Sequence, residues 1–272
     1  MLAIVFAGIG NGFAQNPNSK MGKAKEADFA YEVKTIDEFI ERFNNENNTL
    51  VKTYLEKNFP TRKMPTRPEL VKSLFNYTDP VWDKDLADQF VKDVCDSTKK
   101  EKFLDFYSDD WYALAECQVK YKGTSRRAYI VYQVSTSERE GVAKWVICGA
   151  RAPFLDFSKK VDRRKFLNPI SHSTNFIGMK NAIDDRQFLR NYLSDNFKES
   201  HLNKFLAEVA SGDIQFEQIN YLTYHFLSVD GWMFTVKDYL RLGQNAGWLI
   251  QSLAKKTKEE KIGYRREVLY CD

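Results

Sequence analysis

The clearest signal of the fold is the segment Glu116-Cys117-Gln118-Val119-Lys120-Tyr121-Lys122. Apolar side chains stand at every second position, and charged or polar side chains stand between them. This period of two is typical of a β-strand that buries one face and exposes the other to water. The sequence therefore predicts an antiparallel sheet that starts in this part of the chain.

Further strands follow this one. Residues 128–134 are almost wholly apolar, which favours a central strand, and residues 142–147 carry Trp145 in the next one. Later, Asp230-Gly231 is a two-residue hairpin signal between the apolar runs 222–229 and 232–240. A last strand is expected at 248–253, after a glycine-bounded turn.

Helical patterns precede both groups of strands. Thr35 and Glu38, and again Thr66 and Glu69, have the spacing of a capping box, in which both side chains satisfy free backbone N–H groups. Apolar stripes at helical spacing predict helices at 35–43, 50–57, 66–75, 83–96, 188–193 and 202–209. Helices followed by a run of antiparallel strands predict an α+β fold.

The chain divides into two halves of similar outline. We expect a flexible leader at 15–30, a first α+β domain at 31–157, a basic linker at 158–167 and a second, shorter α+β domain at 168–272. The second half is either a diverged repeat of the first or unrelated to it. The charged run 257–261 is interpreted as a solvated face or tail segment.

The first fourteen residues have the pattern of a secretory signal peptide. Leu2 opens an uncharged apolar run, and Gly12-Phe13-Ala14 places small residues at the −3 and −1 positions of a cleavage site before Gln15. This predicts an exported protein, periplasmic or extracellular. No basic residue precedes Leu2, so the true translation start stays open, as does a buried apolar strand.

Composition excludes several classes of partner. The 272 residues contain 41 basic and 37 acidic side chains, for a net charge of +4, which is too even to favour nucleic acid. No segment is long and apolar enough for a membrane span.

Four cysteines, Cys95, Cys117, Cys148 and Cys271, lack the C-x-x-C spacing of zinc or redox motifs. Four cysteines allow three disulfide pairings, and the sequence does not choose among them. Cys117 and Cys148, in strands of one sheet, are either bridged or simply buried.

The order of the elements between Thr35 and Ala150 resembles the nuclear-transport-factor-2-like superfamily, also called SnoaL-like or cystatin-like. The residues that carry the resemblance are the helix 35–43, the helix 83–96, Tyr112-Ala113-Leu114-Ala115 and Lys144-Trp145-Val146-Ile147. The resemblance implies a curved antiparallel sheet that wraps around helices as a cone with a pocket at its open end. Relatives include isomerases and cyclases as well as modules without catalysis, so fold alone does not decide function.

The sequence contains no G-x-S-x-G, H-E-x-x-H, P-loop or G-x-G-x-x-G motif. Three histidines without metal spacing predict no metal site, and no cofactor is expected. An isomerase-type mechanism needs a carboxylate base, for which Asp105 and Asp109 are the candidates. The same segment reads equally well as a turn, because Asp and Ser bond their own backbone.

Aromatic residues supply the candidates for ligand binding. Tyr129, Tyr132, Trp145, His225 and Trp232 are the residues we expect to contact a ligand. The alternative is that these rings fill the core. His225 alternates with Leu222, Tyr224 and Phe226, so it points away from the side that these three face.

We therefore predict an exported, non-enzymatic protein that binds a small molecule, peptide or protein through a pocket or a sheet face. Two alternatives stay open: an isomerase, cyclase or hydratase with one carboxylate base, and a structural subunit of an envelope assembly. Formation of a homodimer is also left open.

Overall fold

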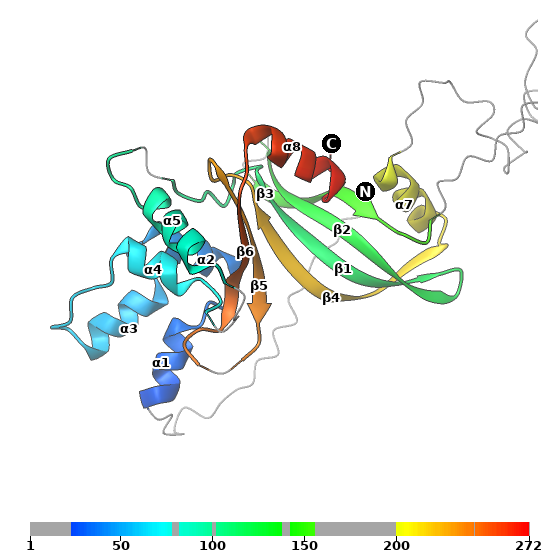
Figure 1. Cartoon of the computed structure of the whole chain (residues 1–272). Coiled ribbons are helices and arrows are strands. Elements are labelled where there is room, and N and C mark those ends of the chain that lie inside the picture. Colours follow the sequence, from blue (N-terminus) through cyan, green and yellow to red (C-terminus); the bar gives the residue numbers. More distant parts are fainter. Residues whose placement is uncertain are drawn as a thin grey trace, which may run out of the picture.

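The computed structural model describes residues 23–77, 82–99, 102–137, 142–155, 200–241 and 243–271. Within these residues the protein is α+β, as predicted (Figure 1). The helices are α1 (Lys23–Tyr31), α2 (Ile36–Asn44), α3 (Leu50–Asn58), α4 (Arg67–Ser73), α5 (Lys84–Val94), α7 (His201–Ala210) and α8 (Lys258–Glu267). The strands are β1 (Trp111–Tyr121), β2 (Thr124–Ser137), β3 (Val142–Arg151), β4 (Ile214–Phe226), β5 (Trp232–Tyr239) and β6 (Gly247–Lys255).

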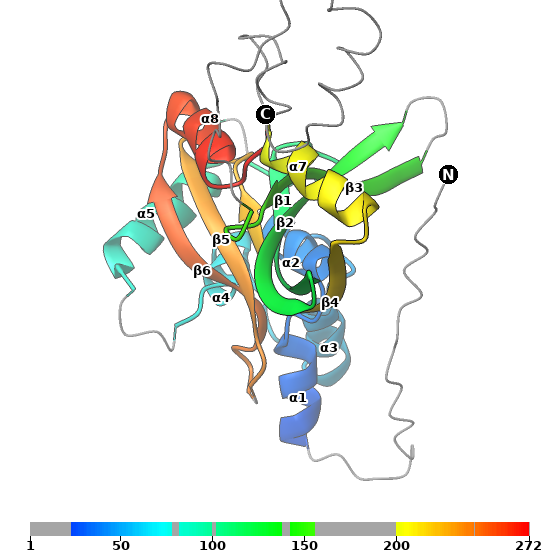
Figure 2. The ribbon, with the colours of Figure 1, turned by 90° about the vertical axis from the view of Figure 1, so that its right-hand side faces the viewer.

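These strands form one antiparallel sheet in the order β3-β2-β1-β4-β5-β6. β1 lies near the middle and pairs with β2 on one side and β4 on the other. Strands from both predicted halves therefore share a single sheet, whose long strands bend visibly in Figure 2. The predicted linker 158–167 and the predicted helix 188–193 lie outside the described residues.

The predicted helix starts of the first half are confirmed. The Thr35 hydroxyl accepts a hydrogen bond from the Glu38 backbone N–H, and the Glu69 carboxylate accepts one of 2.7 Å from the Thr66 backbone N–H. Asp83 caps α5 by accepting from the backbone N–H of Leu86 at 3.0 Å. Each cap satisfies a backbone group that a helix end would otherwise leave without a partner.

Helices α2, α4 and α5 pack on one face of the sheet through an aromatic core. The α2 stripe of Ile36, Phe39, Ile40 and Phe43 is buried, as its spacing predicts. Phe39 stacks on Phe226 of β4 with ring centroids 5.7 Å apart. Burial of such rings is a main stabilising contribution to a fold of this size.

The leader region contains structure that its composition did not predict. Residues 23–31 form α1, in which Ala30 is buried, and Tyr31 meets Tyr54 of α3 edge to face. The Val33 backbone then forms hydrogen bonds at the start of β6. Its N–H donates to the carbonyl of Ala246, and its carbonyl accepts from the N–H of Trp248. Gly247 permits this approach, because a Cβ there would collide with the Val33 backbone and its φ is +78°.

α8 covers part of the other face of the sheet (Figure 1). The charged run 257–261, interpreted as a solvated face or tail, is the N-terminal cap and first turn of this helix. Thr257 and Glu260 form a capping box, with the Glu260 carboxylate 2.8 Å from the Thr257 backbone nitrogen. Behind the helix, Leu269 and Cys271 are buried against Tyr112 and Val131 of the sheet.

The turn predicted at Asp230-Gly231 is present, but the connection is longer than a two-residue hairpin, because β4 ends at Phe226 and its last partner on β5 is Phe234. Gly212 ends α7 with a φ of +80°, and Gly231 turns between β4 and β5 with a φ of +74°. Both values lie in the left-handed region that favours glycine. Among the described residues, no helix has the length and apolar character to cross a membrane.

Candidate functional site

The carboxylates predicted as bases lie in the turn before β1. Asp105 Oδ1 accepts a hydrogen bond of 2.9 Å from the Tyr107 backbone N–H, so its side chain shapes the turn. The Asp109 carbonyl accepts a hydrogen bond of 2.6 Å from the side-chain amide of Gln133, and the Asp110 backbone N–H donates one to the Ser108 hydroxyl. These contacts support the turn interpretation, and neither Asp105 nor Asp109 belongs to the two hollows described below.

The aromatic candidates are not brought together. Tyr132 is half-buried and packs between the two apolar clusters on the helix side of the sheet. Trp145 is 43% exposed and meets Trp111 edge to face at 5.1 Å. Tyr129 lines a hollow on the opposite face.

His225 points to the face opposite Tyr224 and Phe226, as its phase predicts. Its Nδ1 is hydrogen-bonded over 2.8 Å to the hydroxyl of Tyr264 in α8. Burial lowers the pKa of His225 to about 4, so the ring is neutral near neutral pH. Its place beneath α8 gives this histidine a role in holding the helix on the sheet.

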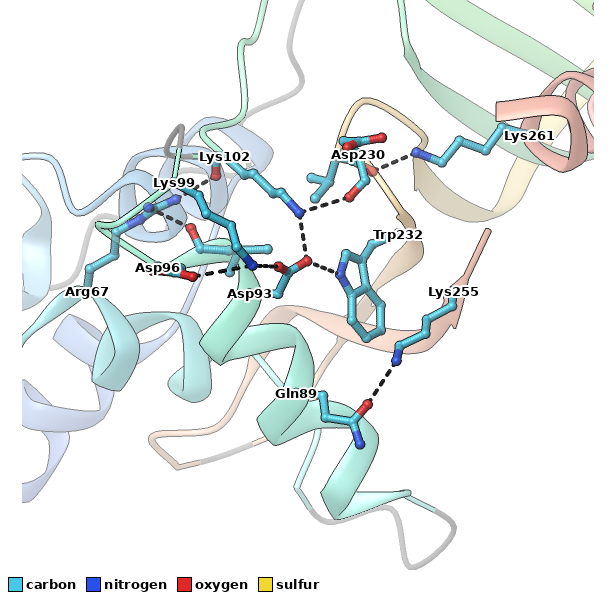
Figure 3. A network of polar contacts seen from close by, with 12 residues as sticks. Arg67, Gln89, Asp93, Asp96, Lys99, Lys102, Asp230, Trp232, Lys255 and Lys261 are labelled. Carbon is cyan, nitrogen blue, oxygen red and sulfur yellow. Dashed lines mark hydrogen bonds and ion pairs between the residues drawn. The ribbon is translucent and has the colours of Figure 1, made fainter. Parts of the chain in front are cut away.

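Trp232 lines a hollow beside α5. This hollow, which we call the Asp93 cleft, has a volume of about 430 Å³. It is lined by Gln89, Lys92, Asp93, Asp96, Lys99, Gly231, Trp232 and Lys255. One wall is α5 with the turn after it, and the other is formed by the ends of β5 and β6 (Figure 3). Ligand pockets in proteins are commonly of about this volume.

Asp93 is the centre of the polar contacts in the cleft. Its Oδ2 accepts 2.6 Å from Lys102 Nζ and 2.8 Å from the indole Nε1 of Trp232 (Figure 3). The hydrogen bond from Lys102 is the largest cause that lowers the pKa of this carboxyl, and the hydrogen bond from Trp232 is the next. Asp93 is therefore ionised at neutral pH, with two donors on Oδ2 and the Lys99 ammonium 3.6 Å from Oδ1.

A second carboxylate is occupied in the same way. Asp96 Oδ1 accepts 2.6 Å from the Thr98 hydroxyl and 3.0 Å from the Thr98 backbone N–H. These bonds lower the pKa of Asp96, with a smaller contribution from Lys99. Lys99 lies 3.6 Å from Asp93 and 3.4 Å from Asp96, distances of loose ion pairs.

Three cations beside the cleft, Arg67, Lys102 and Lys261, hold the surrounding segments in place. Arg67 donates 2.9 Å to the carbonyl of Val94 at the end of α5 and 2.6 Å to that of Lys102. Lys102 Nζ also donates 3.2 Å to the carbonyl of Asp230, which joins the helix side to the β4–β5 turn. From α8, Lys261 donates to the carbonyls of Leu227 and Val229 at the base of that turn.

The rim of the cleft carries lysines with few acidic partners. Within the described residues, no carboxylate pairs with Lys92. Lys255 bonds the neutral amide of Gln89 at 3.0 Å, and its ammonium lies 5.3 Å from the Trp232 ring centroid. The cleft thus presents ammonium donors to solvent while its carboxylates bond internally.

A smaller hollow, the sheet-face hollow, lies on the exposed part of the other face. It measures about 200 Å³ and is lined by Leu114, Glu116, Tyr129, Tyr221, Thr223, Lys237 and Gln251. Glu116 stands between Tyr129 and Tyr221 in register, and Arg127 pairs with it at 3.1 Å. Its volume is below the usual range for ligand pockets.

Most of the cleft was not predictable as a site. Lys92, Asp93, Asp96 and Lys99 lie on the polar side of α5 and its following turn, a pattern that every solvated helix shows. Only Trp232 was among the predicted ligand-binding residues. In the described part of the chain, no cluster of three metal-ligating side chains occurs.

Comparisons with protein-family models, with curated proteins and with solved structures found no match to this chain. The resemblance to the nuclear-transport-factor-2-like superfamily therefore stays a prediction.

Proposed function

We propose that this protein is an exported, non-enzymatic binding protein whose Asp93 cleft holds a small anionic ligand. Export rests on the signal-like pattern of the first fourteen residues. The binding proposal rests on how the charged groups of the cleft are paired. Both carboxylates accept hydrogen bonds from within the protein, whereas the ammonium groups of Lys92 and Lys255 lack acidic partners among the described residues.

The charges of the cleft favour an anion over a cation. A cationic ligand would have to compete with the ammonium groups of Lys99 and Lys102 for Asp93. An anion carrying a carboxylate or phosphate group would meet Lys92, Lys99 and Lys255 directly, through charge-assisted hydrogen bonds. The volume of about 430 Å³ suits a small metabolite.

The same electrostatics argue against general acid–base chemistry in the cleft. A catalytic acid or base works best with a pKa near the operating pH, which for a carboxyl means a raised value. Asp93 and Asp96 both have lowered pKa values. The alternative of an isomerase, cyclase or hydratase would therefore need a different carboxylate.

The test is a series of thermal-shift and calorimetric titrations with citrate, inorganic phosphate and glucuronate, with glucose as the uncharged comparison. We expect stabilisation by at least one anion, none by glucose, and a weaker response in Lys92→Ala. Lys120→Ala, an exposed lysine of β1 outside the cleft, is the matched control. Equal responses in both variants would reject the cleft as the site, and dimerisation without anion binding would favour the assembly alternative.

A further inference from the structure

Two of the four cysteines meet on the α8 side of the sheet. Cys148 lies on β3 and Cys271 lies near the C-terminus, and both pack in one apolar cluster with Tyr112, Val131 and Leu269. The Cys271 thiol donates 3.5 Å to the carbonyl of Leu269, and the Cys148 thiol donates 3.6 Å to that of Val131. Cys271 Sγ also stands 3.0 Å from the position that a Cβ on Gly149 would take, so it reaches the residue next to Cys148.

The other two cysteines lie elsewhere. Cys117 points to the opposite face of the sheet, where it packs with Ala115 and Val119. Cys95 ends α5 and packs against the helix-side core. A bridge between Cys117 and Cys148, one of the alternatives that the sequence left open, would have to pass through the sheet.

The C-terminal segment is already held in place for a bond to Cys148. The Cys271 N–H donates 3.1 Å to the carbonyl of Arg265, which folds the tail back on α8. Gly149 allows the tail to lie against β3, because a Cβ there would collide with the carbonyl oxygen of Leu269. Little chain entropy would be lost when the two sulfur atoms join.

We propose that Cys148 and Cys271 form a disulfide when the protein meets an oxidant that carries a disulfide, such as oxidised glutathione. The Cys148 thiolate attacks one sulfur of the oxidant, forms a mixed disulfide and expels one glutathione thiolate. Cys271 gives its proton to solvent and attacks the Cys148 sulfur, which expels the second glutathione thiolate. Two protein thiols are oxidised, and one glutathione disulfide is reduced to two thiols.

The environments of the thiols agree with these roles. Cys148 is half-buried, and the neighbouring Cys271 side chain, with a smaller contribution from Arg265, lowers the pKa of Cys148. Burial raises the pKa of Cys117 to about 11, which keeps that thiol protonated and unreactive. The disulfide would fasten the segment after α8 to β3 across a long loop of chain.

The test treats the purified full chain with oxidised glutathione and maps its peptides without reduction. We expect one linked pair that joins Cys148 to Cys271, free Cys95 and Cys117, and a thermal midpoint raised by on the order of 10 °C, reversed by dithiothreitol. Cys148→Ser and Cys271→Ala should each abolish the shift, and Cys95→Ser should keep it. A linked peptide that contains Cys95 or Cys117, or four free thiols after treatment of the folded protein, would overturn the proposal.

Discussion

The indole Nε1 of Trp232 donates a 2.8 Å hydrogen bond to Oδ2 of Asp93, and this contact joins β5 to α5 across 139 positions of sequence. Lys102 meets the same carboxylate oxygen at 2.6 Å. The wall of the cleft thus depends on one acceptor that serves two donors from different elements. Its charges are arranged before any ligand arrives, which reduces the cost of binding.

Removal of this acceptor should destabilise the protein. In Asp93→Ala, the Trp232 N–H loses its acceptor and the Lys102 ammonium keeps only the Asp230 carbonyl, so we expect a loss of about 1–3 kcal/mol in the free energy of unfolding. Urea unfolding measures this loss. Asp88→Ala, on the same helix, removes only an exposed ion pair with Lys72 and should cost less than about 1 kcal/mol. Equal losses in the two variants would show that the Asp93 contacts stabilise the fold no more than an exposed ion pair does.

Asp93 should also make stability depend on pH in the acid range. Because its pKa is lower in the folded than in the unfolded chain, the contribution is present above the ordinary carboxyl pKa of about 3.9 and is lost as pH falls through the folded value. The difference in stability between the natural chain and Asp93→Ala should therefore shrink below pH of about 4. A constant difference down to pH of about 2 would contradict this.

His225 should act in a separate pH window. Its pKa is about 4 in the folded protein against 6.5 ordinarily, so the unfolded chain binds the proton more tightly. Stability should fall as pH decreases from about 6.5 toward 4, by up to about 3 kcal/mol. Urea unfolding at several pH values measures the slope. In His225→Phe the slope in this window should be reduced; an unchanged slope would assign it to other groups.

Two glycines should respond in opposite directions to alanine. Gly149→Ala places a Cβ against the backbone oxygens of Leu269 and Tyr270, so we expect a loss of about 1–3 kcal/mol. Gly263→Ala on α8 meets no atom within 4 Å, and should add up to about 1 kcal/mol through helix propensity. Thermal unfolding of both variants checks the contrast. Equal free energies of unfolding in the two variants would mean that residues 269–271 do not pack tightly against Gly149 of β3.

Replacement of Arg67, which lies outside the cleft, should lower the stability of the fold. It donates to the carbonyls of Phe43, Val94 and Lys102, at the ends of two helices and in the segment that follows. We expect Arg67→Ala to cost about 3 kcal/mol, and Arg67→Lys to recover only part, because an ammonium cannot reach three acceptors in that fork. Full recovery by lysine would contradict the role of the planar fork.

The sequence predicts those elements of the fold that local patterns determine. Thr35 and Thr66 mark helix starts because their hydroxyls and a nearby Glu satisfy local backbone groups. Period-two alternation locates β1, and Asp230-Gly231 locates the β4–β5 hairpin. α8 was missed because its polar composition hides a helix, although Thr257 and Glu260 carry the same capping signal.

The candidate site could not be predicted in this way. It is built from contacts between distant residues, such as Lys102 with Asp230 at a separation of 128 positions. Each lysine and aspartate of the cleft looks like an ordinary surface residue in the sequence. Only the fold shows that the carboxylates are occupied and that the ammonium groups face a hollow.

Native mass spectrometry of the folded chain with citrate as the probe measures directly whether the Asp93 cleft binds an anion. We expect one citrate bound to each monomer of the natural chain and of Lys120→Ala, and a strongly reduced bound fraction in the Lys92→Ala/Lys255→Ala double variant. The same bound fraction in all three proteins, or no bound anion in any of them, would contradict the assignment of the Asp93 cleft as an anion-binding site.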